Sequence, residues 1–174
     1  MRNIEKPPIC GRDFLALQEE RGLKSIDYAW ILGMSAPAFG SYKNREAKRN
    51  PARMLRKHRH ALVIRWMLEN EDAEPGLSAP VPRDMIRRLR SLWDGRFSAK
   101  RFGILLGAAG GTASSWGSGQ HHPMTITQRI CSMLHHTDDG LFLERFLAWE
   151  AMALDEAERR GIPDLYQAES WRQA

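Results

Sequence analysis

Two short runs of apolar residues at helical spacing, separated by a glycine, dominate the pattern between residues 25 and 45. Their apolar members are Tyr28, Ala29 and Leu32 in the first run, and Phe39 and Tyr42 in the second. Gly33 accepts the positive φ of a sharp turn, and Ser35 can cap the helix that follows. Helices that cross closely need a small residue at the contact, and Ala29 supplies one. The pattern therefore predicts two short helices around a tight turn.

A second copy of this pattern lies 74 residues further along the chain. The shift places Gly33 on Gly107, and it places Tyr28, Phe39 and Tyr42 on Phe102, Ala113 and Trp116, so that apolar positions stay apolar. The segments before the two copies also correspond, and each predicts a preceding helix. Because internal repetition is stronger evidence than either copy alone, we predict an all-α chain with two similar units.

The first copy resembles the helix-turn-helix of the Cro and lambda-repressor-like (XRE-type) DNA-binding family. The resemblance rests on the small residue, glycine, cap and two aromatics of the motif, which are Ala29, Gly33, Ser35, Phe39 and Tyr42. It departs from the family near Ser25 and Ile26, where a glutamine is common. The resemblance implies two tandem lambda-repressor-like helix-turn-helix units, in which the second motif helix enters the major groove of DNA.

The resemblance also implies which residues contact DNA. Base-reading side chains are expected at Ser41, Lys43, Asn44 and Arg45, with Asn44 the best candidate for an adenine edge. Phosphate contacts are expected from Ser35, Lys48, Arg49, Arg53, Arg56 and Lys57 in the first unit, and from Lys100, Arg101, Thr112, Ser114 and Ser115 in the second. The second recognition helix has no long polar side chain. It either holds phosphates only or serves as a packing or dimer surface.

Composition and charge extend this interpretation. The chain of 174 residues is 43% hydrophobic and carries a formal net charge of +5, which suggests a polyanionic partner. Residues 43–65 hold nine bases against one acid, whereas residues 138–174 hold nine acids against four bases. The histidines His58 and His60 lie within the basic run and are expected on a solvated basic face. Because they are two residues apart, a metal pair on one helix face is disfavoured.

The order of these features divides the chain into five parts. We expect an extended arm at 1–10, a first helix-turn-helix domain at 11–70, a proline-rich linker at 71–83, a second such domain at 84–137, and a C-terminal helix and tail at 138–174. Asn50 and Pro51 are expected to begin the last helix of the first domain. The periodic, acidic segment 141–160 predicts an amphipathic helix that covers the second unit or forms a homodimer interface. Tyr166 and Trp171 either dock the tail or leave it frayed.

The sequence favours a sequence-specific regulator of transcription, of bacterial or phage type, that binds double-stranded DNA. The alternative is a protein-interaction module, such as an antitoxin or a regulator's partner, with a degenerate second helix-turn-helix. No phosphate-binding loop, HExxH or nucleophile elbow is present, so we expect no enzyme, no cofactor and no metal site. No apolar run approaches the roughly 18 to 20 residues of a membrane span, and no signal peptide is evident, so a cytoplasmic location with reduced Cys10 and Cys131 is expected.

Overall fold

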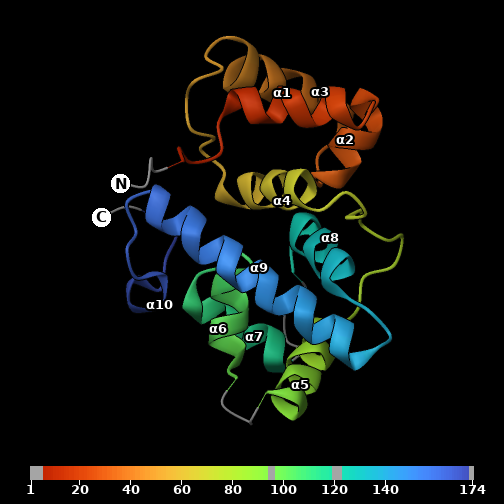
Figure 1. The fold of residues 1–174 in the computed structure, drawn as a ribbon, viewed down its shortest axis with the longest axis vertical. Helices are drawn as coiled ribbons and strands as arrows, with labels where there is room; N and C mark the ends of the chain where they lie inside the picture. The colour runs from red at the N-terminus through yellow and green to blue at the C-terminus, as the bar shows by residue number, and fades with distance from the viewer. Residues whose placement is uncertain (1–5, 94–96, 119–122, 173–174) are drawn as a thin grey trace.

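The periodic apolar segments of the sequence are helices in the computed structural model, which describes residues 6–93, 97–118 and 123–172 (Figure 1). Their bounds are α1 Gly11–Glu20, α2 Ser25–Ile31, α3 Ala36–Tyr42, the π-helix η1 Lys43–Lys48, α4 His58–Glu69, α5 Pro82–Leu92, α6 Ala99–Leu105, α7 Gly110–Ser118, α8 Thr125–Leu134, α9 Asp139–Arg159 and α10 Leu165–Ala168. No β-strand and no helix long and apolar enough to cross a membrane occur within these ranges. The prediction of an all-α fold is confirmed.

The glycine turn occurs twice with the same backbone geometry. A shift of 74 residues carries the bounds of α2 onto those of α6. Gly33 has φ +66° and Gly107 has φ +85°, so both need the left-handed conformation that glycine adopts without strain. In the first turn the Met34 amide donates to the Ala29 carbonyl over 2.8 Å, and in the second Ala108 donates to Gly103 over 2.8 Å. The sequence repeat therefore corresponds to a repeated backbone turn.

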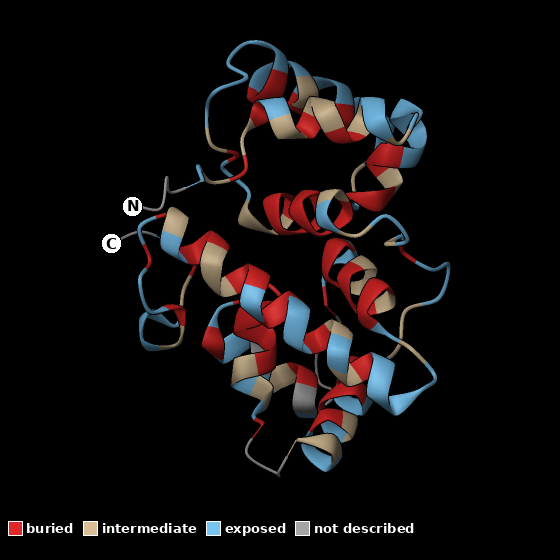
Figure 2. Cartoon of the chain, viewed as in Figure 1, coloured by how far each residue is buried: buried red, intermediate tan, exposed pale blue. Residues whose placement is uncertain are grey.

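Helix α4 lies between the two halves of the chain. Its residues His60 to Met67 are all buried, and Figure 2 shows most of the helix in the buried colour. It packs on α1 from the first half and on α8 and α9 from the second. A helix that is apolar on most sides must be covered on most sides, as the broad apolar set of this segment predicts.

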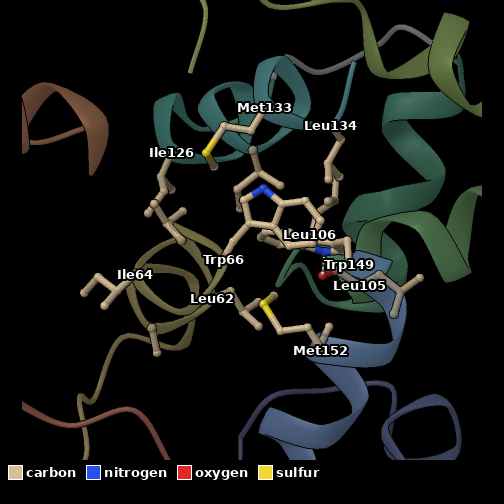
Figure 3. Close-up of a cluster of buried hydrophobic side chains, with 14 of the residues drawn as sticks. Leu62, Ile64, Trp66, Leu105, Leu106, Ile126, Met133, Leu134, Trp149 and Met152 are labelled. Atoms are coloured by element: carbon tan, nitrogen blue, oxygen red, sulfur yellow. Dashed lines mark hydrogen bonds between the residues drawn. The ribbon is translucent and has the colours of Figure 1, made fainter. Parts of the chain in front are cut away.

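Two tryptophans join α4 to α9 at the centre of this packing (Figure 3). The rings of Trp66 and Trp149 meet edge to face with centroids 5.4 Å apart. Trp149 is fully buried, and its Nε1 donates to the carbonyl oxygen of Leu105 over 2.9 Å. The hydrogen bond satisfies the polar end of a buried indole, so the ring can be buried without an unpaired donor. Leu62, Met133 and Leu134 extend the cluster to α8.

The prediction that α4 begins near Pro51 is wrong, because the helix begins at His58. Residues 51–55 instead pair with the start of the chain. The carbonyls of Pro51 and Arg53 accept hydrogen bonds from the first amides of α1, at 2.7 and 3.1 Å, and Leu55 donates to Ile9 over 3.0 Å. The first amides of a helix have no partner within it, and the turn at residues 51–53 supplies two acceptors for them.

A buried carboxylate holds the N-terminal segment and the end of α9 against α4. Glu156 is fully buried and accepts from the Ile9 amide at 3.2 Å, from Arg160 at 2.8 Å and from Arg65 at 3.5 Å. Arg160 also donates to the Leu55 carbonyl over 3.0 Å. Each of these groups would be costly to bury alone, and the network compensates their loss of water. The described part of the predicted N-terminal arm is therefore docked on the second half.

Each glycine turn packs against the first turn of a helix from the other half. A Cβ added to Gly33 would lie 2.8 Å from the backbone nitrogen of Ile126, at the start of α8. A Cβ added to Gly107 would lie 2.5 Å from the Arg59 side chain, at the start of α4. Such distances are shorter than ordinary carbon contacts, so glycine is needed here for space as well as for φ. The turn of the first half thus packs on the start of α8, and the turn of the second half packs on the start of α4.

The predicted solvated position of His58 and His60 is wrong. His60 is buried, with an exposed fraction of 5%. The half-buried His58 donates from Nε2 to the Gly107 carbonyl over 2.7 Å, and its ring stacks on Trp171 at 5.2 Å. Burial, with smaller effects of neighbouring positive charges, lowers the pKa of His58 to about 4 and that of His60 to about 3. Both imidazoles are therefore neutral in the folded chain near neutral pH.

Replacing Gly33 with alanine should destabilise the chain more than replacing Gly22. Both have positive φ, but nothing lies within 4 Å of a Cβ on Gly22. We expect Gly22→Ala to lower the unfolding free energy by about 1–2 kcal/mol through backbone strain alone. Gly33→Ala should cost about 1–3 kcal/mol more, because the methyl group meets α8. Urea denaturation measures both, and equal losses would contradict the packing of the turn on α8.

Stability should fall on mild acidification. Unfolding returns His58 and His60 to a pKa near 6.5, so the unfolded chain binds more protons between that pH and about 4. The stability present above pH 6.5 is therefore lost progressively as pH falls towards 4. We expect the melting temperature to drop by at least roughly 5 °C from pH 7.5 to 5, and the drop to shrink in a His58→Gln, His60→Gln variant. A melting temperature constant over this range would contradict the neutral burial of these rings.

Candidate nucleic-acid interface

Four aromatic side chains anchor α3 to the first two helices. Phe14 of α1 stacks on Tyr28 at 4.6 Å between ring centroids, and Phe39 lies 5.6 Å from Phe14 and 5.3 Å from Tyr28. Tyr42 completes the cluster at 5.8 Å from Phe14. The hydroxyl of Tyr28 donates to the Phe14 carbonyl over 3.0 Å, so this buried polar group is satisfied. The two aromatics that the sequence places on α3 are the side chains that hold it.

The remaining side chains of α3 face outward. Ala36, Pro37, Ala38, Gly40 and Ser41 are all exposed. Ser35 caps the helix, since its hydroxyl accepts from the Ala38 amide over 3.4 Å. A surface of small side chains around a short helix allows its backbone to approach a partner closely.

The helix does not stop at Tyr42 but continues as η1. The wider spacing is visible in the hydrogen bond from the Arg49 amide to the Asn44 carbonyl, 3.0 Å long. Glu46 and Ala47 turn inward, and a Cβ on Gly11 would come within 2.5 Å of the Glu46 carbonyl oxygen. Gly11 thus allows α1 to pack closely against the backbone of η1. Local π-helical segments are frequent at functional sites.

The surface of α3, η1 and the loop after it is strongly cationic. Between residues 28 and 68 the single carboxylate is Glu46, which is buried and paired with Arg45 over 3.0 Å. The cations on this surface are exposed, namely Arg45, Lys48, Arg49, Arg53, Arg56 and Lys57. Exposed bases with no exposed acid among them produce a local positive potential. We call residues 35–49 the α3–η1 arm. Arg53, Arg56 and Lys57 lie in the loop that follows it.

The four predicted base-reading residues lie together on this arm but differ in their freedom. Ser41 and Asn44 are exposed. Lys43 is half-buried and donates to the Gln18 side chain over 2.5 Å, and burial, with the nearby charge of Lys48, lowers the pKa of its amine. Asn44 is therefore free to reach a base, whereas Arg45, whose side chain is 60% exposed, would first have to leave Glu46.

Three of the five predicted phosphate contacts of the second half have partners within the chain. Lys100 pairs with Glu169, and Arg101 pairs with Glu150 and lies 4.6 Å from the Trp93 ring. Thr112 and Ser114 are exposed on α7, whereas the Ser115 hydroxyl donates to the Thr112 carbonyl over 2.7 Å. The exposed face of α7 is therefore small and polar, without a cation of its own.

Arginines of α5 border α7, and they were not among the predicted contacts. Arg83, Arg87 and Arg90 line a cavity of about 420 Å³ together with Ser114. Their basic periodicity on one helix is visible in the sequence, but their position beside α7 depends on packing between helices. Of these, Arg87 pairs with Asp84 over 3.5 Å and Arg90 donates to the Phe97 carbonyl over 2.9 Å.

The apolar side of α9 is buried in the chain itself. Phe142, Phe146 and Trp149 belong to the common core, and the large hydrophobic side chains that remain exposed on this helix are Leu141 and Leu147. Of the two alternatives expected for the tail, docking or fraying, the structure shows docking. Trp171 donates to the Ile104 carbonyl over 2.7 Å, and the Tyr166 hydroxyl donates to Glu150. The segment proposed for a homodimer therefore serves mainly as a cover for the second half.

Among the described residues, no group of three or more His, Cys, Asp or Glu side chains is placed to hold a metal ion. Cys10 and Cys131 are free thiols, and burial raises the pKa of Cys131 to about 12. A thiol of this kind is inert at neutral pH.

No protein-family model, curated protein or solved structure matches this chain.

Proposed function

We propose that this chain is a sequence-specific regulator of transcription that binds double-stranded DNA through the α3–η1 arm. The observation that carries the proposal is the combination of shape and charge on that arm. A helical segment exposed along its outer face is held from beneath by Phe39 and Tyr42, and it ends in a cationic region without an exposed acid. A helix is roughly 10–12 Å in diameter with its side chains, which suits a major groove about 12 Å wide.

In this proposal, side chains of the arm have separate tasks. Asn44 reads an adenine edge, because an amide can donate and accept at the two exposed atoms of that base. Arg45 reaches a neighbouring base. Lys48, Arg49 and the cations of the following loop neutralise phosphates, which fix the position of the arm on the duplex. Ser35 and Ser41 lie at the start and on the face of α3, where they contact backbone oxygens or base edges.

The second half takes a supporting part. Thr112 and Ser114 of α7, with the bordering α5 arginines, can hold phosphates without reading sequence. Lys100 and Arg101 would first have to leave Glu169 and Glu150, so we assign them a structural part in place of the phosphate contact expected from the sequence.

A protein-interaction module is the second candidate, and the face of α7 is the observation that favours it. A surface of Gly111, Thr112 and Ser114, exposed and uncharged, can be covered by another protein without burying a charge. Selection from a random duplex pool separates the candidates. Enrichment of one motif supports the regulator, and binding that never exceeds that of random duplex favours the interaction module.

Two substitutions on the arm should affect DNA binding differently. Asn44→Ala should weaken binding to the selected motif by roughly 1–3 kcal/mol and leave random duplex almost unchanged. Arg49→Ala should weaken both equally, because a phosphate contact carries no sequence information. If about six phosphates are engaged, affinity should fall roughly 10³-fold between 50 and 200 mM salt. Gel shifts at the two salt concentrations measure all three effects.

Lys6→Ala is the matched control for charge. Lys6 is exposed and lies next to Pro7, whose carbonyl accepts from Arg159 at the end of α9, away from the arm. It should change neither affinity nor specificity. Equal losses on selected and random duplex for Asn44→Ala would remove the base-reading assignment, and an effect of Lys6→Ala as large as that of Arg49→Ala would show only a diffuse response to net charge.

A further inference from the structure

A large pocket lies where the two halves of the chain meet, and the proposed DNA-binding function uses only Arg56 and Lys57 of its lining. Its volume is about 980 Å³. The glycine turn at Gly33 lines one side, the first residues of α4 and α8 line others, and Trp171 and Arg172 of the tail close it. Pockets of 300–1,000 Å³ are the size that binds small molecules and cofactors.

The ionisable side chains that line this pocket are all arginine, lysine or histidine. Arg56, Lys57, Arg59, Arg160 and Arg172 line it, and no carboxylate does so among the described residues. Arg160 is paired with Glu156 behind the wall. Arg59 is different, because its Nη1 approaches only the Met124 sulfur, 3.0 Å away, and its buried Nε has no hydrogen-bond partner in the described chain. Burial lowers the pKa of Arg59, as expected for a guanidinium that has lost water without gaining a counterion.

Two helix N-termini also line the pocket. α4 begins at His58 and α8 at Thr125, and neither of the preceding residues, Lys57 and Met124, caps its helix through the side chain. The first amides of these helices carry partial positive charge and lack partners within the helix. Two such ends near one pocket favour a negative group inside it.

A buried histidine provides independent evidence of a missing partner. His60 lines the pocket and is only 5% exposed, yet its Nδ1 has no hydrogen-bond partner among the described residues. A buried ring nitrogen without a partner costs free energy, and an anionic or hydroxyl-bearing ligand at this depth would relieve that cost. A phosphate in the backbone of a duplex remains at the surface and does not reach a group buried to this extent.

The rest of the lining is apolar. Leu32, Ile126 and Trp171 offer rigid apolar surface, and Met34, Met54 and Met124 are side chains that adapt to the shape of a ligand. Inorganic phosphate would leave most of this surface in contact with water. The occupant should therefore combine an anionic group with an apolar body.

We propose that this pocket binds a small organic anion, in which a carboxylate, sulfonate or phosphate group meets Arg59 and the starts of α4 and α8, and an aromatic or aliphatic body fills the side lined by Ile126 and Trp171. The site takes residues from both halves of the chain. The ligand thus stabilises their arrangement, whether or not the α3–η1 arm binds DNA.

The test uses the full chain and the fluorescent anion 8-anilinonaphthalene-1-sulfonate. We expect one dye per chain, displaced by naphthalene-1-sulfonate but not by inorganic phosphate at the same concentration, and a melting temperature that rises with dye. Arg59→Met keeps the stem that packs near Gly107 and removes the charge. It should weaken dye binding at least about tenfold. Arg172→Ala, at an exposed position on the rim, should weaken it about threefold without risk to folding.

Arg12→Met is the matched control, because Arg12 is exposed on α1 outside the pocket and its loss changes net charge equally. It should bind dye like the parent chain. Equal affinity in all three variants, several dyes per chain, or displacement by inorganic phosphate as effective as that by naphthalene-1-sulfonate would overturn the proposal.

Discussion

The close approach of each glycine turn to a helix of the other half is the constraint on which the rest of the structure depends. At Gly33 the approach is to the backbone of α8, and at Gly107 it is to the side chains that begin α4. Since neither position has room for a Cβ, a larger residue would require the backbone of α8 or the side chains at the start of α4 to shift. The same approach brings α4 and α8 together and allows one apolar core to run through both halves. The chain gains stability from a core larger than either repeat of about 70 residues could form alone.

This packing determines which surfaces are left for a partner. The apolar sides of α4 and α9 are buried inside the chain, and several acids of α9 pair with arginines, as Glu156 does with Arg160 and Glu150 with Arg101. The α3–η1 arm is not covered, because only Phe39 and Tyr42 anchor α3. Within residues 28–68 its positive charge is not compensated by an exposed acid. The charge-paired acids thus lie on α9, whereas the exposed cations lie on the α3–η1 arm. The pocket lies between the two halves of the chain.

Local chemistry allowed much of the fold to be predicted from sequence. The positions of Gly33 and Gly107 mark both turns, and the apolar spacing of residues 141–160 marks α9, because these features depend on neighbours in the chain. The start of α4 and the burial of His58 and His60 were predicted wrongly. Pro51 and Asn50 resemble a helix start, yet their segment bonds to the first amides of α1, a contact between residues about 40 apart. The pocket was not foreseen either, since Arg59, Ile126 and Trp171 come from three distant segments and meet only through packing.

The central claim is that the α3–η1 arm is the surface that meets DNA, and hydrogen exchange of the full chain with and without the selected duplex tests it most directly. Amides on a helix that enters a groove exchange more slowly, because the duplex excludes water and suppresses local opening. The account predicts slowed exchange concentrated at residues 35–49, with the exposed face of α9 unchanged. Unchanged exchange at 35–49, or protection concentrated on α9, would contradict it.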